Sequence, residues 1–170
     1  AARRGQTVFQ STCAGCHGTY HKGWDEGLDG AEAFATTDVD YDADLGPIDV
    51  GTDPGRREGI QHFGPRLNEL AISGTFATVV ESQPGYVPPP LDGIFLRYPY
   101  LHDNSVPTLC DLLLPADQRT ATFIQGPSEL PEDYDATCVG YPTGDAIPTR
   151  WNEAHTVVAH GPGLSNQGHD

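Results

Sequence analysis

One short motif constrains this chain more than any other feature. It is C-x-x-C-H, formed by Cys13, Cys16 and His17, the spacing through which c-type haem is attached to a protein. The two thiols can add to the two vinyl groups on one edge of the porphyrin, and the adjacent imidazole then falls beneath the iron as its proximal ligand. We therefore expect one covalently bound haem c, around which the chain folds.

Two other interpretations of the same cysteines are weaker. A thioredoxin-like redox pair needs no histidine directly after it and expects a βαβ context, which the sequence lacks. A zinc site needs a second ligand pair, with its members a few residues apart. The remaining cysteines, Cys110 and Cys138, lie far from each other along the sequence, so the motif favours haem.

The haem motif also predicts where the protein works. Cytochrome c maturation takes place outside the bacterial cytoplasm, so we expect a periplasmic or extracellular location. Two leftover cysteines usually pair in an oxidising compartment, and we therefore expect a disulfide between Cys110 and Cys138. The alternative is a pair of buried free thiols.

The composition indicates a loop-rich fold in which something besides apolar side chains helps to hold the chain together. Hydrophobic residues make up 37% of the 170 residues, less than the roughly 45–50% of typical globular chains. The 20 Gly and 15 Pro predict long loops, and the length suits one domain. We expect a single c-type cytochrome domain over residues 1–170, mainly α, with a class I-like cytochrome c core, extended loop insertions and a few short strands.

The charge excludes some partners and favours others. With 9 Lys and Arg against 24 Asp and Glu, the formal net charge is −15. Such a chain repels nucleic acid and anionic membrane surfaces, and it has no apolar run long enough to span a membrane. A redox protein with a basic docking face would instead be attracted, with a strong dependence on salt.

Local patterns predict few regular elements. Helices are expected over residues 3–11, 56–63, 67–80 and 106–114, with breaks at residues 64–65 and 74, and short strands over residues 122–124 and 156–159. Residues 84–90 are expected to be extended. Residues 18–55 are expected to form an acidic loop insertion, in which aspartates at 38, 40, 42 and 44 resemble calcium-loop spacing. Because the Gly and closing Glu of an EF-hand are missing, a solvated loop is favoured and bound calcium is the alternative.

Four blocks, in order, resemble the dihaem cytochrome c peroxidase superfamily, and most closely its rubber-oxygenase-like branch. They are PLDGIFLRYPYLHDNSVPTL at residues 90–109, TFIQG at 122–126, YDATCVGY at 134–141 and GLSNQGHD at 163–170. The resemblance covers only the C-terminal haem domain of that family, whereas the oxygen-reactive haem of rubber oxygenases belongs to the N-terminal one. It therefore implies the electron-transfer half of the architecture and not oxygenase or peroxidase activity.

The second axial ligand of the iron cannot be methionine, because the chain contains none. The resemblance implies His169, in the closing S-N-Q-G-H segment, as the distal ligand opposite His17. It implies that His102, in the P-Y-L-H block, lies at the haem edge against a propionate or a neighbouring haem. An iron with an open or water-occupied position is the alternative. The remaining histidines, His21, His62, His155 and His160, are weaker candidates.

A bis-histidine iron has no vacant position, so this interpretation predicts an electron carrier rather than an enzyme. Without a methionine ligand, the reduction potential should be lower than that of His/Met cytochromes c. Two alternatives stay open. One is a peroxidase- or oxygenase-type enzyme with an open iron and a polar group such as His102 or Arg97 beside it. The other is a subunit of an extracellular multi-haem assembly, in which neighbouring haem subunits are the partners.

Overall fold

In the computed structural model, which describes residues 1–35 and 37–168, the chain divides into two units. Unit 1 consists of Ala1–Ile48 with Tyr86–Asp92, and unit 2 of Asp49–Gly85 with Gly93–Asp170. No helix of the described residues is both long and apolar enough to cross a membrane.

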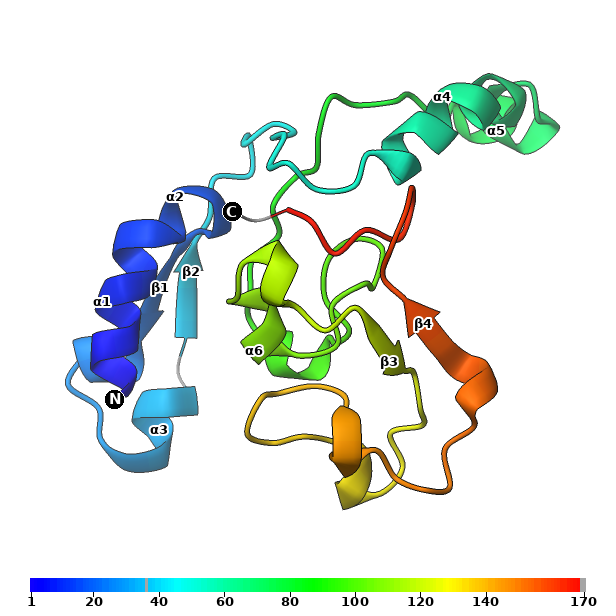
Figure 1. Ribbon diagram of the computed structural model, residues 1–170. Helices are drawn as coiled ribbons and strands as arrows, with labels where there is room; N and C mark the ends of the chain where they lie inside the picture. The colour runs from blue at the N-terminus through cyan, green and yellow to red at the C-terminus, as the bar shows by residue number, and fades with distance from the viewer. Residues whose placement is uncertain (36, 169–170) are drawn as a thin grey trace. The chain divides into compact units, whose positions relative to one another are not determined.

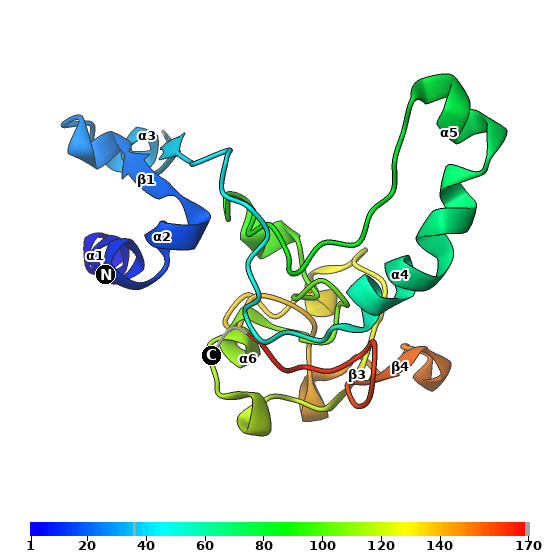
Figure 2. The ribbon, with the colours of Figure 1, turned by 90° about the horizontal axis from the view of Figure 1, so that it is seen from above.

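The elements of unit 1 are α1 (Ala2–Thr12), α2 (Ala14–His17), β1 (Thr19–Lys22), α3 (Gly30–Ala35) and β2 (Thr37–Asp40), with a 3-10 turn at Gly23–Asp25. Helix α2 follows α1 directly (Figures 1 and 2), and the C-x-x-C-H motif runs from the residue between the two helices to the end of α2. The predicted helix over residues 3–11 is confirmed. Strands β1 and β2 pair antiparallel. Gly18 joins the motif to β1 with φ of 84°, and a Cβ there would lie 2.9 Å from the carbonyl oxygen of Asp40, so this turn requires glycine.

The prediction of a loop over residues 18–55 is wrong for its first half, which contains β1, α3 and β2. The reason is visible in β2, where Val39 is half-buried and its neighbours Asp38 and Asp40 are exposed. Successive residues of a strand face opposite sides. Asp38 and Asp40 are therefore solvent-facing positions of a strand, whereas Asp42 and Asp44 follow the strand.

Unit 2 has its own hydrophobic core and a second small sheet. Its elements are α4 (Gly55–Asn68), α5 (Ala71–Phe76), α6 (Leu109–Leu112), β3 (Thr122–Ile124) and β4 (Thr156–Val158), with 3-10 turns at Ile94–Leu96, Ala116–Gln118, Pro131–Asp133, Gly144–Ala146 and Glu153–His155. Both predicted strands are present, and β3 and β4 pair antiparallel. The core is formed by Phe123, Tyr141 and Trp151, and the rings of Tyr141 and Trp151 meet edge to face with centroids 5.8 Å apart.

Two helix predictions in unit 2 are wrong, for different reasons. Helix α4 continues through Pro65, and just beyond it the Asn68 side chain donates to the carbonyl of Val80 at 3.0 Å and accepts from its N–H at 2.7 Å. These tertiary hydrogen bonds favour the helix over the predicted break. Helix α6 is much shorter than predicted, because the extended residue Val106 pairs with Tyr100 and the helix starts only after Thr108, whose hydroxyl accepts from the N–H of Asp111 at 3.0 Å.

The predicted disulfide between Cys110 and Cys138 is present, with Cα atoms 5.0 Å apart. It ties α6 to the loop that follows Tyr134, and the N–H of Cys110 also donates to the carbonyl of Cys138 at 3.2 Å. The crosslink therefore secures two segments of unit 2 that no shared helix or sheet connects.

Candidate functional site

The imidazole of His17 is oriented by a backbone carbonyl. His17 ends α2 and is 8% exposed, and its Nδ1 lies 2.7 Å from the carbonyl oxygen of Pro89. Because a carbonyl oxygen can only accept, Nδ1 carries a proton, and the tautomer that this contact favours has its lone pair on Nε2. A metal-ligating histidine typically donates its other ring N–H in this way, which fixes its tautomer and orientation.

The segment that supplies this carbonyl is itself held by unit 1. The Tyr41 hydroxyl donates to the carbonyl of Pro88 at 2.6 Å, and the N–H of Leu91 donates to the Tyr20 hydroxyl. Ile48 and Tyr86 exchange backbone hydrogen bonds of 2.9 and 3.0 Å. Residues 88–90 are all proline, which fixes their φ angles. The acceptor for His17 is therefore rigidly placed, although it lies 72 residues away in sequence.

Cys13, Cys16 and His17 lie on one helical turn. The N–H groups of Cys16 and His17 donate to the carbonyl of Cys13 at 3.1 and 3.0 Å. Residues spaced i, i+3 and i+4 share a helix face, so both thiols and the imidazole are presented together. Both cysteines are free thiols and half-buried. This donor set fits the two thioether bonds and the axial bond of a haem c.

The packing of unit 1 also fits a large apolar group. Among its described residues, no Leu, Ile, Val, Phe, Tyr or Trp is buried. Helix α1 buries none of its residues, and Val8 and Phe34 are 58% and 60% exposed. Phe9 and Tyr20 pack edge to face, with centroids 5.3 Å apart. A haem bound to the motif would supply the apolar surface that a folded unit needs.

His102 lies in unit 2 and is half-buried. Its Nδ1 is 3.3 Å from the Thr52 hydroxyl, which donates its one proton to the carbonyl of Gln167 at 3.2 Å. The hydroxyl therefore accepts from Nδ1–H of His102. Burial lowers the pKa of His102, and the opposing effect of the Asp103 and Asp53 carboxylates is smaller, so the ring is neutral at pH 7.

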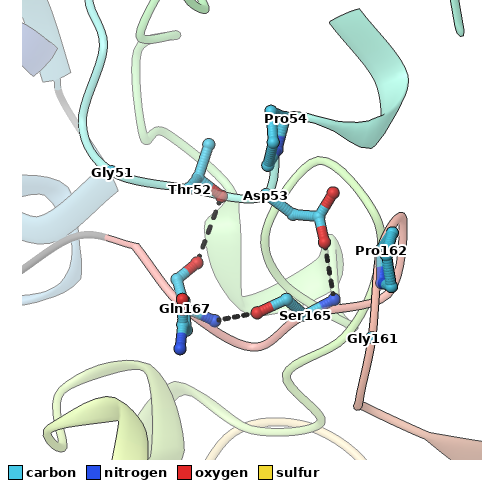
Figure 3. A pocket seen from close by; sticks show the side chains of 8 residues that line it. All are labelled: Gly51, Thr52, Asp53, Pro54, Gly161, Pro162, Ser165 and Gln167. Carbon is cyan, nitrogen blue, oxygen red and sulfur yellow. Dashed lines mark hydrogen bonds between the residues drawn. The ribbon is translucent and has the colours of Figure 1, made fainter. Parts of the chain in front are cut away.

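His169 lies outside the described residues, but the segment before it is described (Figure 3). The Asp53 carboxylate accepts from the N–H groups of Gly163 and Ser165 at 2.9 and 3.1 Å. A cavity of about 370 Å³ adjoins these contacts. Its lining comes from two stretches of unit 2, Gly51, Thr52, Asp53 and Pro54 from one, and Gly161, Pro162, Ser165 and Gln167 from the other.

The other histidines and the acidic stretch form no comparable site. His21, His62, His155 and His160 are all exposed. Within residues 1–35 and 37–168, no group of three or more His, Cys, Asp or Glu side chains converges to hold a metal ion. Bound calcium near residues 38–44 thus stays a prediction from sequence spacing alone.

Two curated relatives come from Sinorhizobium fredii (strain NBRC 101917 / NGR234). Uncharacterized protein y4iM is 29% identical over 154 residues, which are 86% of this chain and 34% of that protein. Uncharacterized protein y4iJ is 25% identical over 214 residues, covering 99% of this chain and 34% of that protein. The chain thus spans about a third of the length of both relatives. No solved structure matches.

A family match agrees with the site geometry. Residues 85–124 match the family described as RoxA-like, cytochrome c-like. The matched stretch contains Pro89, whose carbonyl orients His17, and His102. This match supports a RoxA-like cytochrome c domain, and a cytochrome c-like domain implies haem c.

Proposed function

We propose that this chain is an electron-transfer c-type cytochrome with one haem c. Cys13 and Cys16 hold the haem covalently, and His17 and His169 are the axial ligands of its iron. The observation that carries the proposal is the hydrogen bond from Nδ1 of His17 to Pro89. It gives the histidine of the C-x-x-C-H motif the tautomer that a metal ligand needs.

The bound haem supplies a centre that accepts and releases one electron. The residues around the haem set its reduction potential and decide whether a substrate can reach the iron. The Pro89 carbonyl makes the His17 ring a stronger donor, and donation of this kind stabilises the oxidised iron. Two imidazole ligands leave no position for a substrate, so the centre transfers electrons without bond chemistry. We expect its reduction potential to lie below that of His/Met centres of similar burial.

The haem motif and the disulfide support an electron carrier that works outside the cytoplasm. Haem c is attached there, and the Cys110–Cys138 disulfide suits an oxidising compartment. The net charge of −15 favours a redox partner with a basic docking face and accelerates its approach at low salt. The proposed fold is a class I-like cytochrome c core with loop insertions, and neighbouring haem subunits are the alternative partners.

Two measurements test the proposal. After acid–acetone extraction, the intact mass should still exceed that of the polypeptide by one haem, and a Cys13→Ser/Cys16→Ser variant should lose it. The oxidised protein should show a low-spin spectrum, and His169→Ala should convert it to high spin and let carbon monoxide bind the reduced form. Extractable haem would contradict covalent attachment. A high-spin spectrum of the unaltered protein would favour the enzyme alternative, with an open iron.

A further inference from the structure

The carbonyl that orients His17 comes from a segment that cannot pair in a sheet. Residues 88–90 are all proline, so none of them has a backbone N–H group to donate. They belong to no helix or strand. Hydrogen bonds can therefore hold this segment only through its carbonyl oxygens and through the residues on either side of it. The position of the Pro89 carbonyl depends on a few contacts from other elements of unit 1.

Two tyrosine hydroxyls bind the segment on either side of Pro89. The Tyr41 hydroxyl donates to the carbonyl of Pro88 at 2.6 Å, and the Tyr20 hydroxyl accepts from the N–H of Leu91. The carbonyl that accepts from the proximal imidazole lies between these two contacts. The two hydroxyls and the imidazole thus bind three consecutive peptide groups, so the tyrosines fix the peptide groups next to the acceptor.

Both tyrosines are placed by the small sheet that follows the haem motif (Figure 1). Tyr20 lies in β1, and Tyr41 is the residue directly after β2. The register of the sheet sets Tyr41 beside Gly18, the residue after the motif, where an added Cβ would lie 3.3 Å from that of Tyr41. The pairing of β1 with β2 therefore brings both tyrosines next to the motif, although they are 21 positions apart in sequence.

The Tyr20 side chain is itself held by helix α1. Its ring packs edge to face against Phe9, with centroids 5.3 Å apart, and its backbone carbonyl accepts from Nε2 of Gln6 at 3.2 Å. Oε1 of Gln6 accepts in turn from the indole N–H of Trp24 at 2.8 Å. A hydroxyl on a ring that is held in this way loses little conformational entropy when it binds the proline segment.

We propose that Tyr41 and Tyr20 are positioning residues that lower the reduction potential of the haem by keeping the Pro89 carbonyl within bonding distance of the proximal imidazole. This inference rests on the proposed role of His17 as an axial ligand. A histidine ligand that donates its other ring N–H is a stronger donor to the iron and favours the oxidised state. Both tyrosines act through the peptide groups beside that carbonyl, and neither is a ligand of the iron.

The test compares three tyrosine-to-phenylalanine variants of the complete holoprotein. Tyr41→Phe and Tyr20→Phe each remove one hydroxyl that binds the segment and keep the aromatic ring. Tyr134→Phe is the matched control, because the Tyr134 hydroxyl also donates to a backbone carbonyl, that of Phe95 at 3.3 Å, but both residues belong to unit 2. All three variants keep the C-x-x-C-H motif and should therefore keep covalent haem.

The main readout is the reduction potential, which a merely structural role would leave unchanged. Tyr41→Phe and Tyr20→Phe should each shift the equilibrium toward the reduced haem by about threefold, or about 28 mV for a one-electron centre. The second readout is exchange of the His17 Nδ1–H with solvent, followed by NMR of the reduced protein. Exchange should become about fivefold faster in both variants, because the carbonyl leaves the imidazole more often. Tyr134→Phe should change neither quantity.

The outcomes separate this inference from the proposed function. Absence of covalent haem in the unaltered protein would overturn the proposed function and this inference with it. If the haem is covalent but Tyr41→Phe and Tyr20→Phe keep the potential of the unaltered protein, the positioning role alone is overturned. An equal rise in the potential of Tyr134→Phe would also overturn it, as would a rise without faster exchange of the Nδ1–H. Should Tyr20→Phe not bind haem, the potential of Tyr41→Phe decides.

Discussion

At the scale of single residues, hydrogen bonds decide which nitrogen each buried histidine offers. The Pro89 carbonyl assigns the proton of His17 to Nδ1, and Thr52 does the same for His102. In each ring the favoured neutral tautomer therefore has its lone pair on Nε2. The family resemblance assigns the two histidines different roles. His17, next to the cysteines, is the expected iron ligand, and His102, in the P-Y-L-H block, is expected at the haem edge.

The burial of His102 predicts a loss of stability in mild acid. Burial lowers its folded pKa below the unfolded value of about 6.5. As the pH falls through that value, the unfolded chain binds more protons, so the free energy of unfolding decreases between pH 7 and pH 5. His102→Gln should flatten this decrease in urea unfolding of the holoprotein, whereas the exposed His62→Gln should not. An unchanged slope in His102→Gln would contradict the prediction.

The sequence predicts the haem-binding residues, but it does not predict the residues that hold them in place. The spacing of Cys13, Cys16 and His17 predicts the haem-binding residues, because attachment of one haem requires neighbours on one helical turn. The residue that orients His17 is distant, since Pro89 lies 72 positions away in sequence. No local pattern encodes such pairs. The three consecutive prolines were the one available signal, and they indicated only an extended chain.

At the scale of secondary-structure elements, tertiary contacts override local propensity in both directions. Pro65 was expected to end a helix, yet α4 continues to Asn68, whose side chain is bound to Val80. The apolar run over residues 106–114 was expected to be a helix, yet Val106 pairs with Tyr100. The predictions of a helix over residues 3–11 and of strands over residues 122–124 and 156–159 are confirmed by α1, β3 and β4.

The disulfide should contribute much of the stability of unit 2. Its cysteines are separated by 28 residues, and closing such a loop in the unfolded chain stabilises the fold by roughly 3.6 kcal/mol in the chain-entropy model. A Cys110→Ser/Cys138→Ser variant should unfold at clearly lower urea concentration while keeping covalent haem. Unfolding at the same urea concentration as the unaltered protein would show that the crosslink adds no stability.

A glycine beside β3 should be intolerant of any side chain. A Cβ at Gly126 would overlap the indole ring of Trp151, whereas Gly5 in α1 has open space around it. Gly126→Ala should cost about 1–3 kcal/mol of unfolding free energy through overpacking. Gly5→Ala, the matched control, should be neutral or stabilise by about 0.5–1 kcal/mol, because alanine favours helix. Equal effects in urea unfolding would contradict the packing around Trp151.

At the scale of the whole molecule, the two units have different sources of stability. Unit 2 has buried aromatic side chains, a disulfide and buried charges bound to its backbone. Among the described residues of unit 1, α1 buries no side chain, and polar contacts such as that between Trp24 and Gln6, at 2.8 Å, join its elements. The buried hydrophobic residues therefore lie mostly in unit 2. The composition predicted that something besides apolar side chains stabilises the fold, but it could not show which residues depend on it.

This difference predicts that loss of haem unfolds one part of the chain before the other. In a Cys13→Ser/Cys16→Ser variant, amide hydrogen exchange should become fast throughout α1, β1 and β2, because these elements lack a core without the haem. Amides of β3, β4 and α6 should stay protected, since their core and disulfide remain. The Cys110→Ser/Cys138→Ser variant is the reciprocal control, with exchange increased mainly in α6 and the loop after Tyr134. Retained protection of α1, β1 and β2 in the variant without haem would mean that polar contacts alone fold unit 1, and the structural role assigned to the haem would be wrong.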